Sequence, residues 1–150
     1  MIKLDAIDRR ILAALQVDGR MSTLEVAAKV GLSPTPCSRR IKRLEETGVI
    51  EGYMARVNPV ALGRSICVMV SVRLAKQGPE GHGQFLRAIQ GRAEITECLL
   101  VTGNIDYLLR AWVEDIDALR VFITEVLQSI PTVAETSTML IVHSTKQADF

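Results

Sequence analysis

The sequence predicts an α+β protein with an N-terminal winged helix-turn-helix domain and a C-terminal domain of element order β-α-β-β-α-β. Apolar residues follow a helical spacing through residues 4–44, and their period changes to two from Ile66 onward. The charge changes as well, since residues 1–58 hold ten basic against seven acidic residues and residues 59–150 hold eight against ten. We therefore predict a first domain over residues 1–58, a linker over 59–65 and a second domain over 66–150.

The composition excludes several classes of protein. Hydrophobic residues make up 48% of the 150 residues, which supports a buried core and argues against disorder. The longest apolar run, residues 66–70, is far too short for a membrane span, and the charged start contains no secretory signal. The three cysteines form no CxxC pair and lie far from both histidines, so we expect core thiols and no metal site. These features predict a cytoplasmic protein without a metal, a cofactor or membrane contact.

Two helices are predicted before residue 31. The first is capped by Asp5 and ends near Gly19, with its apolar positions at Leu4, Ile7, Ile11, Leu12, Ala14 and Leu15. The second spans residues 23–30 and begins with a capping box, because Glu25 stands three residues after the N-cap Ser22. Gly31 ends this helix, whose apolar positions are Leu24, Ala27, Ala28 and Val30.

The third predicted helix begins at Ser33 and carries a basic face. Pro36 has no N–H group, so the Ser33 hydroxyl is expected to cap the helix through the amide of Thr35. A buried stripe is formed by Cys37, Ile41 and Leu44, and the residues that point away from it are Ser38, Arg39, Lys42 and Arg43. Two helices joined by a short glycine-containing turn, with cations on the second, indicate a helix-turn-helix that reads the major groove of DNA.

Residues 49–57 alternate loosely in polarity around a central glycine and predict a short β wing. An alternative for the whole N-terminal part is a plain three-helix bundle whose cations are only solvated. The coincidence of cap, turn, apolar stripe and basic face favours the DNA-binding interpretation.

The second half predicts a ferredoxin-like sheet. Alternation from Ile66 to Ala75 predicts a first strand with Ile66, Val68, Val70, Val72 and Leu74 on one face. A short helix around Phe85 follows, then strands over residues 95–101 and 106–113 joined by a Gly103-Asn104 turn. An amphipathic helix from Ile116 to Ile130 and a last strand over residues 136–143 complete the order. The face of the sheet that the helices leave open is half apolar, which favours dimerisation through it.

The chain resembles the Lrp/AsnC family of transcriptional regulators, the leucine-responsive or feast/famine regulators, over essentially its whole length. The motifs that carry the resemblance are Leu4-Asp5 through Ile11-Leu12, Asp18-Gly19-Arg20, residues 31–37, Arg43-Leu44-Glu45, Gly48-Val49-Ile50, Tyr53, Glu97-Cys98, residues 101–109 and Val133. The family implies a C-terminal domain of the RAM type, a homodimer that assembles into tetramers or octamers, and an amino-acid effector bound between subunits.

The resemblance also assigns candidate site residues. For double-stranded DNA they are Ser33, Pro34, Thr35, Ser38, Arg39, Arg40, Lys42 and Arg43, with Arg39 and Lys42 toward bases or phosphates and Arg40 and Arg43 toward phosphates. For a small amino acid they are Leu100, Thr102, Gly103, Asn104, Asp106, Tyr107, Thr136 and Thr138. Gly103 permits close backbone approach to a ligand carboxylate, and Asp106 is either the partner of the ligand ammonium or a simple turn residue. Many family members carry Asp where this chain has Asn104, so the identity of the effector does not carry over.

Two rival functions remain open at this stage. Siroheme decarboxylases are similar in fold to the family, but they need histidines suited to a tetrapyrrole, and this chain has only His82 and His143. A ligand-binding module whose helix-turn-helix contacts only proteins is the second rival, against which the basic face argues. No constellation of catalytic residues is apparent, so we expect a regulator of amino-acid metabolism genes and not an enzyme.

Overall fold

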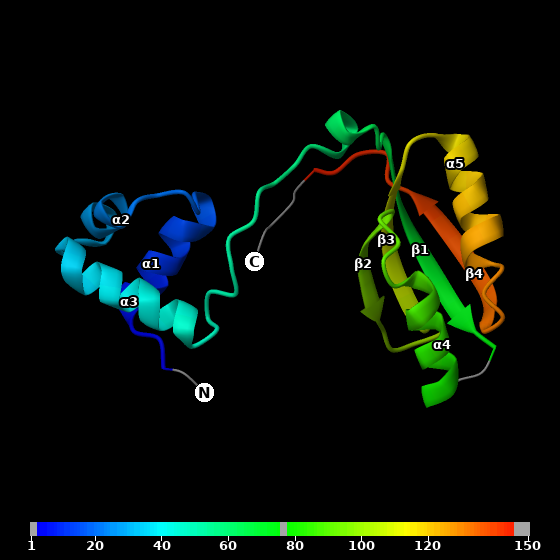
Figure 1. The fold of residues 1–150 in the computed structure, drawn as a ribbon, viewed down its shortest axis with the longest axis horizontal. Helices are drawn as coiled ribbons and strands as arrows, with labels where there is room; N and C mark the ends of the chain where they lie inside the picture. Colours follow the sequence, from blue (N-terminus) through cyan, green and yellow to red (C-terminus); the bar gives the residue numbers. More distant parts are fainter. Residues whose placement is uncertain (1–2, 76–77, 146–150) are drawn as a thin grey trace. The chain divides into compact units, whose positions relative to one another are not determined.

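The computed structural model describes residues 3–75 and 78–145, and it divides the chain into two compact units with the boundary between Arg56 and Val57. The first unit is drawn in blue to cyan in Figure 1, and the strands of the second are drawn in green to red. The end of the predicted second domain, residues 146–150, lies outside the described residues. Each unit has its own hydrophobic core.

The first unit consists of three helices, α1 (Ala6–Val17), α2 (Thr23–Val30) and α3 (Pro34–Glu46). Their fully buried apolar residues are Ile11, Val26, Ala27, Val30, Cys37 and Leu44. The expected core positions Leu24 and Ala28 are wrong, because Leu24 is 65% exposed and Ala28 is exposed too. Val26 is buried in their place, since the eight-residue helix α2 has its core face on residues 26, 27 and 30.

The helix caps follow the sequence at two of three positions. Asp5 caps α1, and Ser22 with Glu25 forms the predicted capping box of α2. Ser33 is the N-cap residue of α3, but its side chain accepts no capping hydrogen bond, so that expectation is wrong. A serine cap commonly bonds the amide of the third helical residue, which here is Pro36 and has no N–H, and the Thr35 amide does not replace it.

Residues 51–58 form an extended segment but no strand, which differs from the β wing that the sequence predicts. Helix α3 ends where Gly48 takes a φ of 69°, and the amides of Val49 and Ile50 both donate to the Leu44 carbonyl oxygen. The segment that follows has no hydrogen-bonded neighbouring strand in the described part of the unit, so its alternation has no ladder to join.

Tyr53 attaches this extended segment to the helices. Its hydroxyl donates to Glu45 Oε1 at 2.9 Å, and its ring lies so close to Gly19 that a Cβ there would stand 3.2 Å from Tyr53 Cδ1. Helix α1 ends at Val17 with Asp18 as its C-cap residue, and the glycine that follows leaves space for an aromatic ring.

The second unit is a four-stranded antiparallel sheet in the order β2-β3-β1-β4, as a ferredoxin-like fold requires. The strands are β1 (Ile66–Leu74), β2 (Ile95–Leu100), β3 (Tyr107–Val113) and β4 (Val133–Leu140), and the helices are α4 (Pro79–Ile89) and α5 (Ile116–Val121). A short 3-10 helix, η1 (Pro59–Leu62), occupies the stretch predicted as a linker.

Strand β4 begins and ends three residues earlier than the sequence predicts. It pairs with β1 from Val133 opposite Leu74 to Leu140 opposite Val68, so His143 lies beyond the strand. The shift arises because the helical segment already ends at Leu127, and the Thr132 carbonyl oxygen accepts from the Ala75 amide just beyond the end of β1.

The predicted long helix from Ile116 to Ile130 changes type in its middle. α5 continues without interruption into a π-helical segment, η2 (Phe122–Leu127), in which the Gln128 amide donates to the carbonyl oxygen of Ile123 five residues earlier. The hydroxyls of Thr124 and Ser129 donate to the carbonyl oxygens four residues before them and so compete for the ordinary helical acceptors.

Both helices cover one face of the sheet. The core there contains Val68, Val70, Val72, Leu74, Phe85, Ile89, Tyr107, Leu109, Ala111, Val113, Phe122, Leu127 and Ile130. On the opposite face Met69, Leu108 and Trp112 are only half buried, and Leu99 and Met139 are exposed. The half-apolar open face that the alternation of β1 predicts is therefore present.

Leu109→Ala tests this core. Leu109 is fully buried in the central strand β3, so its truncation is expected to lower the free energy of unfolding by about 2–5 kcal/mol. Leu86→Ala on α4 is the control, because Leu86 is 45% exposed and its loss should cost at most about 1 kcal/mol. Urea unfolding followed by the fluorescence of Trp112, at fixed protein concentration, measures both, and equal effects of the two substitutions would contradict the assignment.

Candidate functional site

The outward face of α3 is open and positively charged. Pro34, Thr35 and Ser38 are exposed in its first half, and Arg39 follows them without an ion-pair partner in the described part of the chain. Lys42 is exposed as well, with its Nζ 3.6 Å from Oε1 of Glu46 one turn further on. A face of short polar side chains followed by cations, opposite an apolar stripe, suits contact with a DNA groove.

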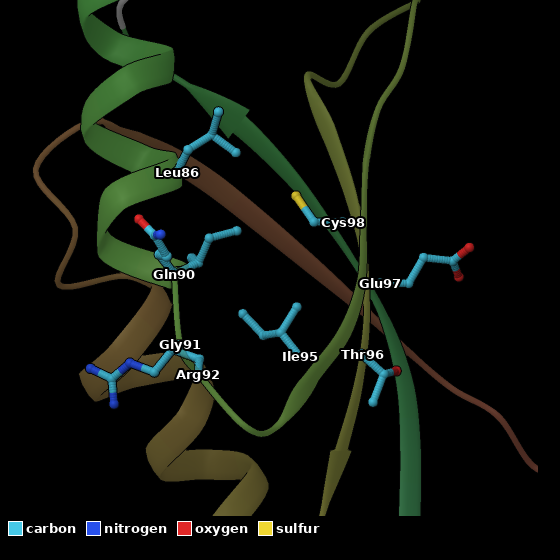
Figure 2. A pocket seen from close by; sticks show the side chains of 9 residues that line it. Leu86, Gln90, Gly91, Arg92, Ile95, Thr96, Glu97 and Cys98 are labelled. Carbon is cyan, nitrogen blue, oxygen red and sulfur yellow. The ribbon is translucent and has the colours of Figure 1, made fainter. Parts of the chain in front are cut away.

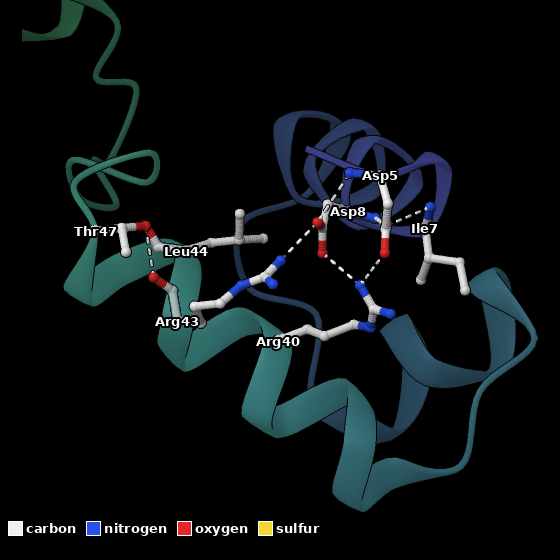
Figure 3. A network of polar contacts seen from close by, with 7 residues as sticks. All are labelled: Asp5, Ile7, Asp8, Arg40, Arg43, Leu44 and Thr47. Atoms are coloured by element: carbon white, nitrogen blue, oxygen red, sulfur yellow. Dashed lines mark hydrogen bonds and ion pairs between the residues drawn. The ribbon is translucent and has the colours of Figure 1, made fainter. Parts of the chain in front are cut away.

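Arg40 and Arg43 do not share this open face. Both side chains extend from α3 toward the beginning of α1, as Figure 3 shows. Nη1 of Arg40 lies 2.7 Å from Oδ2 of Asp5 and 2.8 Å from Oδ1 of Asp8, and Nη2 of Arg43 lies 2.6 Å from Oδ2 of Asp8. We call this group of four residues the Asp8 clasp. It ties the first turn of α1 to α3.

Asp8 is the centre of the clasp and is only 1% exposed. Burial by itself raises the pKa of this carboxyl group, but the Asp5 amide and the two guanidinium groups donate to it and hold its pKa below the ordinary value. The hydrogen bond from the Asp8 amide, together with Arg40, lowers the pKa of Asp5 to about 2. The same two carboxylates raise the pKa of Arg40. Asp5, Asp8 and Arg40 are therefore charged at neutral pH.

Arg40 and Arg43 are predicted from the sequence to contact phosphates, and their carboxylate partners are not predicted. A signal was available, because Asp8 falls within the apolar stripe of α1, between Ile7 and Ile11. A carboxylate at such a position needs a partner when the stripe is buried. Which residue supplies the partner depends on how the helices pack.

The β2–β3 turn, residues 101–106, holds the central part of the effector candidates. Thr102, Gly103 and Asn104 are exposed, and Gly103 has a φ of 126° that other residues rarely adopt. The Val101 amide donates to the Asp106 carbonyl oxygen at 3.0 Å and closes the turn. The turn thus presents backbone to solvent in a conformation that depends on glycine.

Asp106 fastens this turn to the end of β1. Its amide donates to the Val72 carbonyl oxygen at 2.9 Å, and its Oδ2 accepts from the Leu74 amide at 2.7 Å. The sequence predicts Asp106 to be either a ligand partner or a turn residue. These contacts show that it stabilises the turn against β1. One carboxylate oxygen is committed to the backbone of β1.

The remaining effector candidates are spread across the sheet. One row of directly paired residues crosses the sheet from β2 to β4 and contains Leu100, Tyr107, Val72 and Thr136. Leu100 and Thr136 therefore lie about 14 Å apart. Tyr107 is buried under α4, where its hydroxyl is 2.8 Å from Nδ1 of His82 and its ring stacks at a tilt on Phe85. Thr136 and Thr138 lie on β4 at the opposite edge of the sheet from the turn. One subunit therefore does not gather the whole set.

A hollow of about 400 Å³ between α4 and β2 was not predicted from the sequence. Figure 2 shows Leu86, Ile95 and the Cys98 thiol directed into it, while Glu97 points away. Burial raises the pKa of the Cys98 thiol. Glu97 is the acidic residue of the lining, and its Oε2 lies 3.4 Å from Nε of Arg110. None of the candidate effector residues lines it.

The described residues contain no cluster of three or more His, Cys, Asp or Glu side chains arranged to hold a metal ion. Within the same part of the chain no helix has the length and apolar character needed to cross a membrane. His82 is engaged with Tyr107, and His143 follows β4 in an exposed position.

Comparisons with known proteins match both units. A model of winged helix-turn-helix DNA-binding domains matches residues 4–51, and a model of the Lrp/AsnC ligand binding domain matches residues 67–149. The leucine-responsive regulatory protein of Escherichia coli strain K12 is 45% identical over 146 residues, which cover 97% of this chain and 89% of that protein.

Two solved structures resemble the whole chain. One is a transcriptional regulator from Neisseria meningitidis in complex with L-Met, with a TM-score of 0.93, 29% identity, and coverage of 97% of this chain and 94% of that one. The other is an AsnC family transcriptional regulator from Agrobacterium tumefaciens, with a TM-score of 0.89, 35% identity and the same coverage.

Asp8→Asn tests the Asp8 clasp through the pH dependence of stability. The pKa values of Asp5 and Asp8 are lowered in the folded protein, so their contribution is complete above the unfolded value near 4 and is lost as the pH falls toward about 2. At neutral pH the substitution is expected to cost about 1–3 kcal/mol, because it removes a charged acceptor from two guanidinium groups.

The measurement is thermal unfolding followed by circular dichroism, and the difference in Tm between wild type and Asp8→Asn should shrink between pH 5 and pH 2. Glu46→Gln is the control, since Glu46 is an exposed carboxylate on the same unit. A difference in Tm that does not change over this range would show that the clasp is not charged as described.

Proposed function

The chain belongs to the Lrp/AsnC family of transcriptional regulators, and we propose that it binds duplex DNA through α3 and a small amino acid through the β2–β3 turn. The matched family consists of regulators, which decides against the siroheme decarboxylase alternative. The observation that carries the proposal is the exposed cationic face of α3, opposite its buried stripe. We extend the proposal to action on genes of amino-acid metabolism in the cytoplasm, which the resemblance to the family supports.

For DNA we propose that α3 enters the major groove with its first turns leading. Residues in the first turns contact bases or phosphates, and these are Ser33, Pro34, Thr35 and Ser38. Arg39 and Lys42 reach base edges or phosphates from the exposed face, because they are the cations of α3 outside the Asp8 clasp. Arg40 and Arg43 contact phosphates through the donors that their carboxylate partners leave free.

We further propose that the open face of the sheet forms a homodimer with a second copy. Met69, Leu108 and Trp112 are half buried there without a covering helix, and exposed Leu99 and Met139 extend the apolar surface across all four strands. A two-fold pair places two copies of α3 on a near-palindromic site, with half-sites about 34 Å apart. Tetramers or octamers of such dimers are the further assembly that the family implies.

The effector site is proposed to lie between subunits. Residues 102–104 lie in the turn between β2 and β3, and Thr136 and Thr138 lie on β4, beyond β3 and β1, so a ligand that touches both sets is proposed to need parts of two subunits. The positive φ of Gly103 suits close approach of a ligand carboxylate, and Asn104 supplies a neutral polar group beside it. The Neisseria regulator holds L-Met, which supports an amino acid as the class of ligand.

A gel-shift titration on the DNA upstream of the protein's own gene tests the whole proposal, at fixed moderate salt and with a panel of the common amino acids. Specific retardation that one amino acid changes would support both parts. Retardation that no amino acid changes would retain DNA binding and contradict the effector site. Absence of specific retardation on this and on other promoters would overturn the proposal.

Arg39→Ala tests the DNA face. If Arg39 reads a base, the substitution should weaken specific binding by about 1–3 kcal/mol and relax the preference at one base position. Arg10→Ala is the control, because Arg10 is an exposed cation on α1 of the same unit. Competition gel shifts with operator variants provide the measurement, and an unchanged affinity with an unchanged base preference would remove Arg39 from the site.

Gly103→Val tests the effector turn. A β-branched residue at a φ of 126° is strained by about 1–3 kcal/mol, so the turn should change and the amino-acid response should weaken about tenfold or more. DNA binding without effector should persist. Gly91→Val is the matched control, since Gly91 also has a positive φ, of 78°, but lies between α4 and β2. Calorimetric titration with the active amino acid measures the response, and equal losses in both variants would indicate a general effect on folding.

A further inference from the structure

A second hollow lies on one side of α3. Its volume is about 310 Å³, and it is lined by Pro36, Arg39, Arg40 and Arg43. These residues have the spacing i, i+3, i+4 and i+7, so they form one continuous stripe along the helix. The stripe runs beside the apolar stripe of Cys37 and Leu44, between the core and the open DNA face.

We propose that this hollow binds one phosphate of the DNA backbone, and that Asp8 is the positioning residue that holds Arg40 and Arg43 around it. The inference rests on the proposed function in one respect, namely that α3 docks on duplex DNA. It adds a phosphate subsite with a defined lining and assigns a role in DNA binding to a residue of α1.

The contacts of the two arginines leave donors for a ligand. Arg40 uses Nη1 for both carboxylates, and Arg43 uses Nη2 for Asp8. A guanidinium group has five N–H donors in a fixed fork, so each arginine keeps several that the clasp does not use. Neither side chain is closed off, because 28% of Arg40 and 47% of Arg43 remains exposed. Figure 3 shows both guanidinium groups fixed at one end by Asp8.

The charges around the hollow match a phosphodiester. The guanidinium groups of Arg39, Arg40 and Arg43 bring three positive charges, and Asp5 and Asp8 bring two negative charges. The remaining single positive charge equals in size the negative charge of one backbone phosphate. Arg39 is the arginine of the lining that does not belong to the Asp8 clasp. Pro36 adds an apolar wall without an N–H donor.

The position of the stripe also fits a phosphate better than a base. A helix in the major groove faces base edges along its outermost line, and the phosphate backbones run along both sides. Ser38 and Lys42 lie on the far side of Arg39 from Arg40, so the hollow occupies the flank of the helix. Arginines anchored to a buried carboxylate have fewer conformations to lose when they bind an anion.

Asp8→Asn tests the proposal because the expected change in DNA affinity is opposite to the change that charge alone predicts. The substitution removes a negative charge from the DNA-binding unit, so charge alone predicts tighter binding to DNA. The proposal predicts weaker binding, by about threefold to tenfold, because the arginines lose the charged acceptor that orients them. The measurement is fluorescence anisotropy of the full-length protein with a labelled duplex from upstream of its own gene, over a KCl series.

Arg43→Gln is the second variant, and it leaves the contacts of Asp8 with Arg40 in place. Loss of one phosphate contact should reduce the slope of log K against log[KCl] by about 0.9, on the specific duplex and on a scrambled one alike. Arg43→Lys keeps the charge and should restore the slope. Arg10→Gln is the control, with the same charge change on an exposed position of α1, and it should leave the slope unchanged.

Tighter binding by Asp8→Asn, measured where circular dichroism shows the variant folded, would overturn the positioning role. An equal slope for Arg43→Gln, Arg10→Gln and wild type would overturn the phosphate subsite while leaving DNA binding by α3 intact. Lack of salt-dependent DNA binding by the wild type would overturn the proposed function and this inference together.

Discussion

The Asp8 carboxylate is buried from water in the first turn of α1, and a buried anion is tolerated only when donors surround it. Here the donors come from two directions, the amide of Asp5 at the start of α1 and the guanidinium groups of Arg40 and Arg43 on α3. This requirement fixes how α3 lies against α1. It also separates the cations of α3 into two that are anchored and two, Arg39 and Lys42, that remain on the open face. The surface that we propose for DNA thus follows from an interaction inside the unit.

The sheet of the second unit also has two different faces. One face is closed by α4 and α5 over a continuous core, and the other keeps half-buried Met69 and Trp112 without a covering element. The β2–β3 turn is fastened to β1 by Asp106, and Gly103 is exposed there with a positive φ. A sheet with one free face and a rigid turn at its end is suited to pair with a second copy and to bind a small ligand at the junction.

These two arrangements connect the functions of the units. The proposed effector site is incomplete in one subunit, and the proposed DNA site needs two copies of α3 at a fixed spacing. The dimer that we propose meets both conditions, and in this proposal a ligand that prefers one assembly over another changes DNA binding through its differential affinity for the two states. No direct contact between the DNA site and the effector turn is needed for this coupling.

The sequence by itself determined the elements whose causes are local. These elements depend on neighbours within four residues, and they are the caps at Asp5 and Ser22, the apolar stripe of α3 and the alternation of β1. The motifs of the sequence also placed the chain in its family. Only the tertiary structure decided the partners of Arg40 and Arg43, the unpaired extended segment after α3 and the register of β4. Each of these depends on groups far apart in the chain, such as Arg40 and Asp8, 32 residues apart, or on a strand that must be present to pair. The spacing of apolar residues predicts which face of a helix or strand is buried, but it does not predict which residues pack against that face.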